Sequence, residues 1–291
     1  MIEIVNRLVM LGCVFLVSAC SAVLVAAAQS PSFETFLANA DSHRGHREYE
    51  TGLTLADTLA SMSPSSIVAL MPTFNKYSRS ESDDTREYVC EFLLSIAARP
   101  DAATILQPAD DMIVRLMSDR VSETQSGAVY IAQFVILRSG TDDAKYAAAL
   151  TKLIGDDRAD PSVQANAIAP LLALYNNGLA DPSVIATIMK FLSSRNGLED
   201  DTRIAIISSL ANLTDVPEEI SEFIASLSQS QNRRVRIATI MAYHDARVTS
   251  SLRQQLKRRL EATVDDPNED PKVRDLAKRA LAGEALLNPN I

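Results

Sequence analysis

Apolar residues recur along most of the chain at the three- and four-residue spacing that places them on one face of an α-helix. Leu252, Leu256 and Leu260 form one such stripe, with Val264 one turn further on. The breaks between these segments are short and polar, as at residues 155–161. No sustained alternation of β-branched and polar residues occurs between them, so the pattern predicts an all-α fold.

Several predicted helices carry a recognisable start signal. Asp-Pro pairs stand at residues 160–161, 181–182 and 270–271. An Asp side chain accepts a hydrogen bond from a free backbone N–H of the first turn, and Pro at the first helical position has no N–H to leave unpaired. These pairs therefore predict where helices begin.

The helix starts also repeat one pattern, which is most complete in the run Asp270, Val273, Arg274, Ala277 and Leu281. In the other copies the Val position is occupied by Thr85, Gln125, Val163, Ile204 and Val235. The resulting period of about 40 residues, with two helices per unit, is typical of a repeat array.

This pattern resembles the HEAT-repeat family. The resemblance covers residues 51–287 and implies a right-handed α-solenoid of stacked antiparallel helix pairs. Arg86, Arg236 and Arg274 match the Arg that follows the Val position in that family, whereas Gln164 and Ala205 depart from it. A continuous ladder of Asp–Arg pairs between units is therefore not expected.

The N-terminal segment is uncharged from residue 8 to residue 28. Its run Val17-Ser18-Ala19-Cys20 resembles a bacterial lipobox, which implies cleavage before Cys20 and lipidation of that Cys. Ser21 after the Cys implies, by the same analogy, an outer-membrane destination. Cleavage after Ala28 as an ordinary secretory signal, and retention as an uncleaved membrane anchor, are the alternatives.

The remaining boundaries follow from composition. Residues 29–50 are predicted to form a polar spacer and residues 288–291 a short tail. Only 5% of the 291 residues are aromatic and Trp is absent, which favours a core of Ala, Leu, Ile and Val in closely packed helices. After cleavage Cys90 is the only ordinary thiol, so no intramolecular disulfide is expected and Cys90 is interpreted as a small buried hydrophobe.

Charge is distributed unevenly along the chain. Residues 1–230 contain 16 Lys and Arg against 29 Asp and Glu, whereas residues 231–291 contain 12 against 8, which together give the formal net charge of −9. Six cations of this C-terminal region are the predicted partner-binding residues: Arg233, Arg234, Arg236, Arg253, Lys257 and Arg258. The alternative is that these cations pair with the neighbouring acidic loop at residues 265–270.

No phosphate-binding loop, dinucleotide fingerprint, zinc-protease motif or EF-hand occurs in the sequence. His43 and His46 are three residues apart, but Gly45 lies between them and no further ligand follows, so no metal site is predicted. We therefore expect a non-enzymatic periplasmic protein without a cofactor, which binds another protein of the cell envelope. Binding of anionic lipid or cell-wall polymer is the alternative, nucleic acid is not an expected partner, and an enzyme is the least favoured class.

Overall fold

The computed structural model describes residues 32–42, 49–139, 144–194, 198–210, 216–244, 250–284 and 286. The chain divides after Ser32, and the second unit, from Phe33 onward, contains all of the described helices. These residues form α-helices and two short 3₁₀ turns and contain no strand, which confirms the predicted all-α solenoid. The elements are α2 (Phe33–Ser42), α3 (Tyr49–Ser61), α4 (Pro64–Val68), α5 (Met71–Tyr77), α6 (Asp83–Ala97), α7 (Ala102–Leu106), η1 (Gln107–Ala109), α8 (Asp110–Leu116), α9 (Ser122–Ser139), α10 (Ala144–Ile154), α11 (Pro161–Asn176), α12 (Ser183–Ser194), α13 (Asp200–Leu210), α14 (Glu218–Ser226), η2 (Leu227–Gln229), α15 (Arg233–His244), α16 (Ser250–Asp265) and α17 (Pro271–Leu281).

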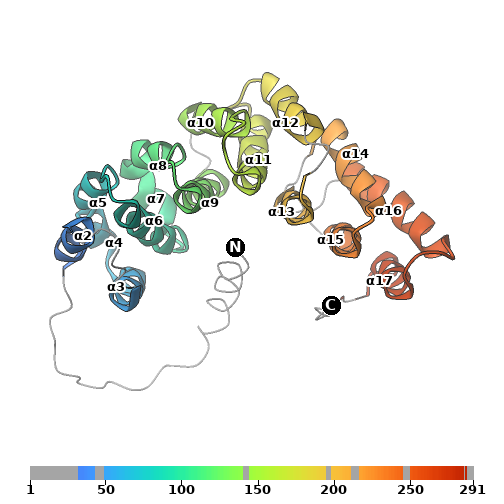
Figure 1. The fold of residues 1–291 in the computed structure, drawn as a ribbon, viewed down its shortest axis with the longest axis horizontal. Coiled ribbons are helices and arrows are strands. Elements are labelled where there is room, and N and C mark those ends of the chain that lie inside the picture. Colours follow the sequence, from blue (N-terminus) through green and yellow to red (C-terminus); the bar gives the residue numbers. More distant parts are fainter. Residues whose placement is uncertain are drawn as a thin grey trace, which may run out of the picture. The chain divides into compact units, whose positions relative to one another are not determined.

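The helices stack in two rows, and the members of a pair come from different rows (Figure 1). In the first row α6, α9, α11, α13, α15 and α17 each pack against the next. In the second row α8 packs against α10, α10 against α12, and α14 against α16. Contacts between α10 and α11, and between α16 and α17, join the rows. Each pair thus buries its apolar face against its neighbours, as in repeat proteins generally.

The repeat is visible in the first turn of every first-row helix from α6 onward. The residue at one equivalent position of that turn is buried in all six helices: Thr85, Thr124, Val163, Thr202, Val235 and Val273. Successive members are separated by 39, 39, 39, 33 and 38 residues.

Two members of this series differ from the sequence prediction. The prediction placed Gln125 and Ile204 at these positions, but helix α9 begins at Ser122 and α13 at Asp200. The first-turn residues that face the core are consequently Thr124 and Thr202, because a helix fixes which face a residue occupies by its distance from the helix start.

The predicted Asp caps of two helices are confirmed. The Asp160 carboxylate accepts a hydrogen bond from the backbone N–H of Ser162 at 2.7 Å, and Asp270 accepts one from that of Lys272 at 2.8 Å. The backbone donor of Lys272 lowers the pKa of Asp270, since this hydrogen bond favours the ionised carboxylate. These caps fix the starts of α11 and α17.

Helix α11 lies at the centre of the stack, and all of residues 162–174 are buried. It contacts α9 and α13 within its own row and α10 in the other row. A helix that is apolar around its whole circumference is expected where neighbours cover every face. Alanines at 165, 167, 169 and 173 keep these neighbours close, as the composition predicted.

The packed region begins earlier than predicted. Residues 29–50 were expected to be a polar spacer, but Phe33, Phe36 and Leu37 of α2 are buried. The rings of Phe33 and Phe92 meet edge to face with centroids 5.2 Å apart, and those of Phe36 and Tyr88 at 4.9 Å. One short helix thus buries two aromatic rings, enough apolar area to attach it to the stack.

Helices α6 and α9 approach closely where Cys90 meets Gly127. A Cβ atom at position 127 would lie 2.5 Å from the Cys90 Sγ, and the thiol in turn contacts the Thr124 carbonyl oxygen at 3.5 Å. Burial raises the pKa of the Cys90 thiol far above its usual range. Cys90 is therefore the inert, buried side chain that the sequence predicted.

Replacing Gly127 with Ala should destabilise the protein by about 1–2 kcal/mol. The steric cost of an extra methyl group in a packed interior is about 1–3 kcal/mol, partly offset by about 0.5–1 kcal/mol from the better helix propensity of Ala. In a Cys90→Ala background the Sγ atom is gone, so the same substitution should become neutral or stabilising. Urea denaturation of the four variants checks this, and an equal effect of Gly127→Ala in both backgrounds would contradict it.

Candidate functional site

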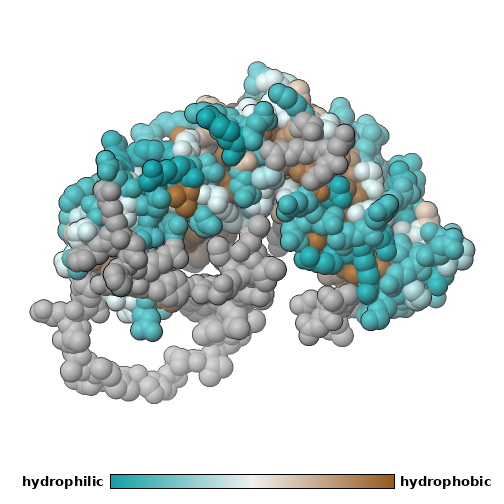
Figure 2. Space-filling model, in the orientation of Figure 1, coloured by the Kyte–Doolittle hydropathy of each residue, from teal (hydrophilic) through white to brown (hydrophobic). Residues whose placement is uncertain are grey.

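Helix α16 carries the predicted cations Arg253, Lys257 and Arg258 on its solvent-exposed side. Its leucine stripe is buried on the opposite side, with Leu256 completely inaccessible. Figure 2 shows hydrophilic residues over α14 and α16 at the right of the view. We refer to the exposed cations of this helix, Arg253, Lys257, Arg258 and Arg259, as the α16 basic surface.

The cations of the α16 basic surface differ in their surroundings. Lys257 lies 3.8 Å from the Glu261 carboxylate, and both side chains are more than half exposed. The guanidinium of Arg253 lies 5.9 Å from the centre of the Tyr243 ring. Arg258 and Arg259 make no side-chain ion pair with any residue that the structure describes. The surface thus presents net positive charge to solvent.

The three predicted cations of α15 are engaged within the protein. Arg233 lies 3.6 Å from Asp270, and Arg234 lies 3.0 Å from Asp201. Arg236 is the least exposed of the three, since its side chain is only 15% exposed. For Arg233 and Arg236 the structure shows the alternative that the sequence left open, pairing with the acidic loop at residues 265–270, whereas Arg234 pairs with Asp201 on the surface. The predicted set of six therefore divides between a structural group on α15 and an exposed group on α16.

Arg236 links two successive units of the stack. Its guanidinium donates to the Glu269 carboxylate at 2.7 Å and to the backbone carbonyl oxygen of Ser230 at 2.7 Å. We call this arrangement the C-terminal junction. Because it fastens the loop before α17 to the start of α15, the charge of Arg236 serves stacking rather than solvent or ligand.

The same arrangement occurs near the other end of the stack, at the N-terminal junction. Arg86 donates to both oxygens of Asp119, at 2.5 and 3.0 Å, and to the carbonyl oxygen of Ser80 at 2.7 Å. In both junctions the acid lies 33 residues after the Arg and the carbonyl lies six residues before it. The partnership with Asp119 raises the pKa of Arg86. The Arg at this repeat position thus connects successive units in both junctions.

The corrected register gives the Arg position a long polar side chain in every unit: Arg86, Gln125, Gln164, Arg203, Arg236 and Arg274. The sequence alignment had placed Ala205 there, whereas the residue after buried Thr202 is Arg203, which lies 3.1 Å from Asp200. Gln164 donates to the carbonyl oxygens of Ile154 and Asp156, each at 2.8 Å. Among the described residues only Arg86 and Arg236 join successive units through Arg–carboxylate pairs, so these positions do not form a continuous ladder.

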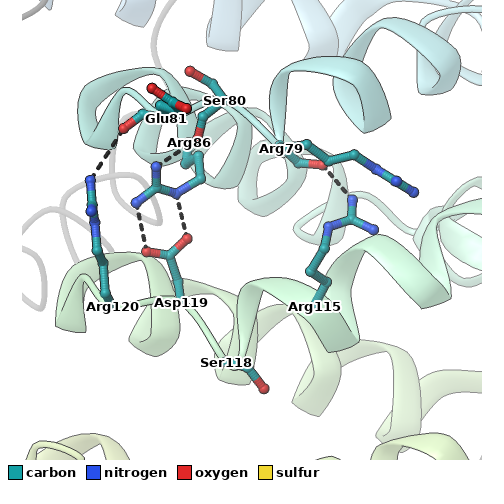
Figure 3. Close-up of a pocket in the computed structure, with 9 residues that line it drawn as sticks. Arg79, Ser80, Glu81, Arg86, Arg115, Ser118, Asp119 and Arg120 are labelled. Carbon is teal, nitrogen blue, oxygen red and sulfur yellow. Dashed lines mark hydrogen bonds and ion pairs between the residues drawn. The ribbon is translucent and has the colours of Figure 1, made fainter.

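A charged pocket of about 610 Å³ lies beside the N-terminal junction (Figure 3). It is bounded by the loop between α5 and α6 and the loop between α8 and α9. Four Arg side chains line it, together with serines and the carboxylates of Glu81 and Asp119: Arg79, Arg86, Arg115 and Arg120. We refer to it as the arginine pocket.

The sequence did not predict the arginine pocket. Arg79 and Arg115 lie in different units, and each is a single basic residue in an otherwise unremarkable stretch. Only stacking brings the two loops together. No signal in the sequence alone, apart from the repeat period, connects these positions.

Other predicted features carry no site in the described residues, or lie outside them. Among the residues that the structure describes, no group of three or more His, Cys, Asp and Glu side chains is arranged to hold a metal ion. Within the same ranges no helix is long and apolar enough to cross a bilayer. Cys20, Ala28, His43 and His46, as well as the tail at residues 288–291, lie outside the described residues.

The sequence matches the family model described as the vitellogenin TPR domain over residues 109–280, well over half of the chain. The sequence pattern resembled HEAT repeats, and the matched family is named for TPR units, which are likewise stacks of helix pairs. The match therefore confirms a helical repeat solenoid, the architecture that both have in common. No curated protein matches the sequence.

Several solved structures of engineered repeat proteins are similar to the chain at low identity. An engineered protein is 20% identical, with a TM-score of 0.44, over 86% of this chain and 67% of that one. A designed armadillo repeat protein is 17% identical, with a TM-score of 0.43, over 74% of this chain and all of that one. Computationally designed armadillo repeat proteins for modular peptide recognition give 16% identity and a TM-score of 0.41.

Asp119→Asn should destabilise the protein by about 3 kcal/mol. The side chains of Arg86 and Asp119 are 9% and 7% exposed, so removing the Asp119 charge leaves a largely buried Arg86 that pairs only with the half-exposed Asp83. Replacing both, as Arg86→Met and Asp119→Leu, should recover much of the loss because no buried charge is then left unpaired. The midpoint of urea unfolding measures both effects.

A matched control is Arg158→Ala, since the Arg158 side chain is 93% exposed and pairs only with Asp156 of its own loop. It should change stability by less than about 0.5 kcal/mol. An Asp119→Asn variant as stable as the wild type would show that the N-terminal junction does not hold the units together.

Proposed function

The chain belongs to the vitellogenin TPR-domain family, and on that premise we propose that it is a non-enzymatic scaffold that binds another protein. Stacked helix pairs present an extended, regular surface of exposed side chains, which suits binding of a partner. The sequence motifs for phosphate binding, metal-dependent hydrolysis and nucleophilic catalysis are absent, which supports a role without chemistry.

The observation that carries this proposal is the α16 basic surface. Its four cations lie within a seven-residue stretch of one helix, and two of them, Arg258 and Arg259, make no ion pair with any residue that the structure describes. The α15 cations show that this stack can neutralise Arg internally when structure requires it. Arg258 and Arg259 are not neutralised in this way by a described residue, so their charge is available to a partner with an acidic surface.

A protein partner is favoured over an anionic membrane or cell-wall polymer. The chain as a whole has a formal net charge of −9, so a broad anionic surface would repel most of the molecule while attracting one helix. A folded partner can place its negative charge opposite α16 alone. Electrostatic attraction of this kind mainly affects the association rate and the choice of partner.

The second part of the proposal concerns location. We propose that the protein is exported to the periplasm and held at a membrane, with the outer membrane favoured, by a lipid on Cys20. Support comes from the uncharged segment at residues 8–28 and its lipobox-like end. The expected partner is accordingly another protein of the cell envelope.

Reversing charge on the α16 basic surface should remove a partner. The variant Arg253→Glu/Lys257→Glu/Arg258→Glu is expected to lose at least one protein that crosslinks to the wild type in intact cells, since opposite charges would become like charges. The matched control, Arg158→Glu/Lys190→Glu, reverses exposed cations elsewhere in the stack and should keep every partner. An unchanged partner set in the triple variant would contradict the proposal.

The same variants distinguish the alternative function. Sedimentation with vesicles of phosphatidylglycerol and phosphatidylethanolamine should show no binding that depends on α16. Binding that the triple variant loses, and that weakens between low and physiological salt, would instead assign α16 to an anionic surface.

Cys20→Ser tests the lipid anchor separately from the partner. A lipoprotein should lose incorporation of labelled palmitate and leave the membrane fraction, or should fail to be processed. Cleavage after Ala28 predicts no change on this substitution, and that outcome would exclude the anchor without affecting the scaffold proposal. Cys90→Ser is the control, because Cys90 is buried and should have no effect on fractionation.

A further inference from the structure

The two junctions are close structural counterparts, and their differences show which charges the stack itself requires. Both contain the Arg–acid pair and the Arg–carbonyl bond. Both also contain a second ion pair between the same two positions, with the charges exchanged. Asp83 pairs with Arg120 at 2.8 Å in the N-terminal junction, and Arg233 lies 3.6 Å from Asp270 in the C-terminal one.

Two cations of the arginine pocket have no counterpart in the C-terminal junction. Arg79 stands seven residues before Arg86, and the residue seven before Arg236 is Gln229. Arg115 is near the end of α8, where the end of α16 has Val264 and Asp265. One junction of the same construction therefore forms without positive charge at these places, so Arg79 and Arg115 are not demanded by stacking.

Neither of these two cations forms an ion pair with a described residue, and Asp111 acts on Arg115 only through charge at longer range. Arg115 donates only to neutral groups, the Asn75 side chain at 2.9 Å and the Ser78 hydroxyl at 2.6 Å. Its Nε atom is buried and has no hydrogen-bond partner. Arg79 is exposed, and its side chain makes no hydrogen bond or ion pair with the residues that the structure describes.

Burial and the nearby charge of Arg79 lower the pKa of Arg115. Arg120 donates to Asp83 and to the Glu81 carbonyl oxygen, and Asp119 is bound by Arg86. Figure 3 shows the guanidinium groups of Arg79 and Arg115 on one side of the pocket, with Glu81 and the Arg86–Asp119 pair on the other. On one side of the arginine pocket Arg86 and Arg120 are bound in ion pairs, whereas on the other side Arg79 and Arg115 form no ion pair with a described residue.

We propose that Arg79 and Arg115 bind a carboxylate of an acidic segment of a partner protein, which enters the arginine pocket between the two loops. This inference rests on the scaffold role proposed above and assigns a second contact surface to it. The guanidinium fork matches the two oxygens of a carboxylate, and a bound carboxylate would accept hydrogen bonds in the way that Asp119 already does from Arg86.

A protein carboxylate is favoured over phosphate by the composition of the pocket. Glu81 and Asp119 also line it, so a doubly charged phosphate would be repelled more strongly than a single carboxylate. The Ser78 and Ser118 hydroxyls provide neutral donors beside the two cations. A pocket of about 610 Å³ accommodates several side chains of a peptide.

The test uses the full-length processed protein and a fluorescein-labelled hexaglutamate peptide, with binding followed by fluorescence anisotropy at low salt. Arg79→Ala should weaken binding about tenfold, since one charge-assisted hydrogen bond is lost. Arg79→Ala/Arg115→Gln should weaken it further. Because the Arg79 side chain is exposed and makes no hydrogen bond or ion pair with a described residue, the Arg79→Ala variant should fold and melt like the wild type, which circular dichroism checks.

Two controls separate this site from the α16 basic surface. Arg158→Ala should bind the peptide like the wild type, and the α16 triple reversal should retain the component of binding that Arg79→Ala removes. If the α16 variant loses all binding while the Arg79 and Arg115 variants keep it, the pocket proposal is overturned and the scaffold proposal stands. Conversely, loss of binding in the Arg79 and Arg115 variants, with binding retained in the α16 variant, supports the pocket proposal.

Two further results would also overturn the proposal. One is a wild-type protein that does not bind the peptide at low salt. The other is displacement of the peptide by inorganic phosphate at a lower concentration than by acetate, which would assign the two cations to phosphate.

Discussion

Every helix pair of this protein has an apolar face that only the neighbouring pairs can cover, and the rest of the structure follows from that constraint. It places one buried residue in the first turn of each first-row helix, from Thr85 to Val273. It also surrounds α11 so completely that this helix has no solvent-exposed face along most of its length. Each unit contacts only the units next to it. Burial of apolar surface between these neighbours is the main favourable contribution to the stability of the stack.

Stacking of apolar faces does not by itself determine how the loops are placed relative to one another, and hydrogen bonds from polar side chains do. The residue after each buried first-turn position is Arg or Gln, and it hydrogen-bonds to the end of a neighbouring helix or loop in several units. Arg86 and Arg236 add a carboxylate from the next unit. These bonds neutralise charge within the stack, and they explain why Arg236 of α15 is largely buried rather than exposed to a partner.

The cations that remain outside this network are therefore informative about function. Arg258 and Arg259 on α16 and the pair Arg79 and Arg115 lie in different units, and none of the four forms an ion pair with a described residue. A helical repeat protein with two separate positive surfaces on an otherwise acidic chain suits a scaffold that holds an acidic partner by more than one contact. Two weak contacts on one frame can bind a partner more tightly than either does alone.

The sequence by itself determined the all-α class, the two-helix period and most helix starts, because these depend on local spacing of apolar residues and on caps such as Asp160 and Asp270. It misplaced the start of the packed region, since the burial of Phe33 and Phe36 depends on rings of α5 and α6 that lie far away in sequence. It also treated the six C-terminal cations as one group. Only the tertiary structure separated Arg236 from Arg258 and brought Arg79 to Arg115, because charge compensation depends on which loops stacking places side by side.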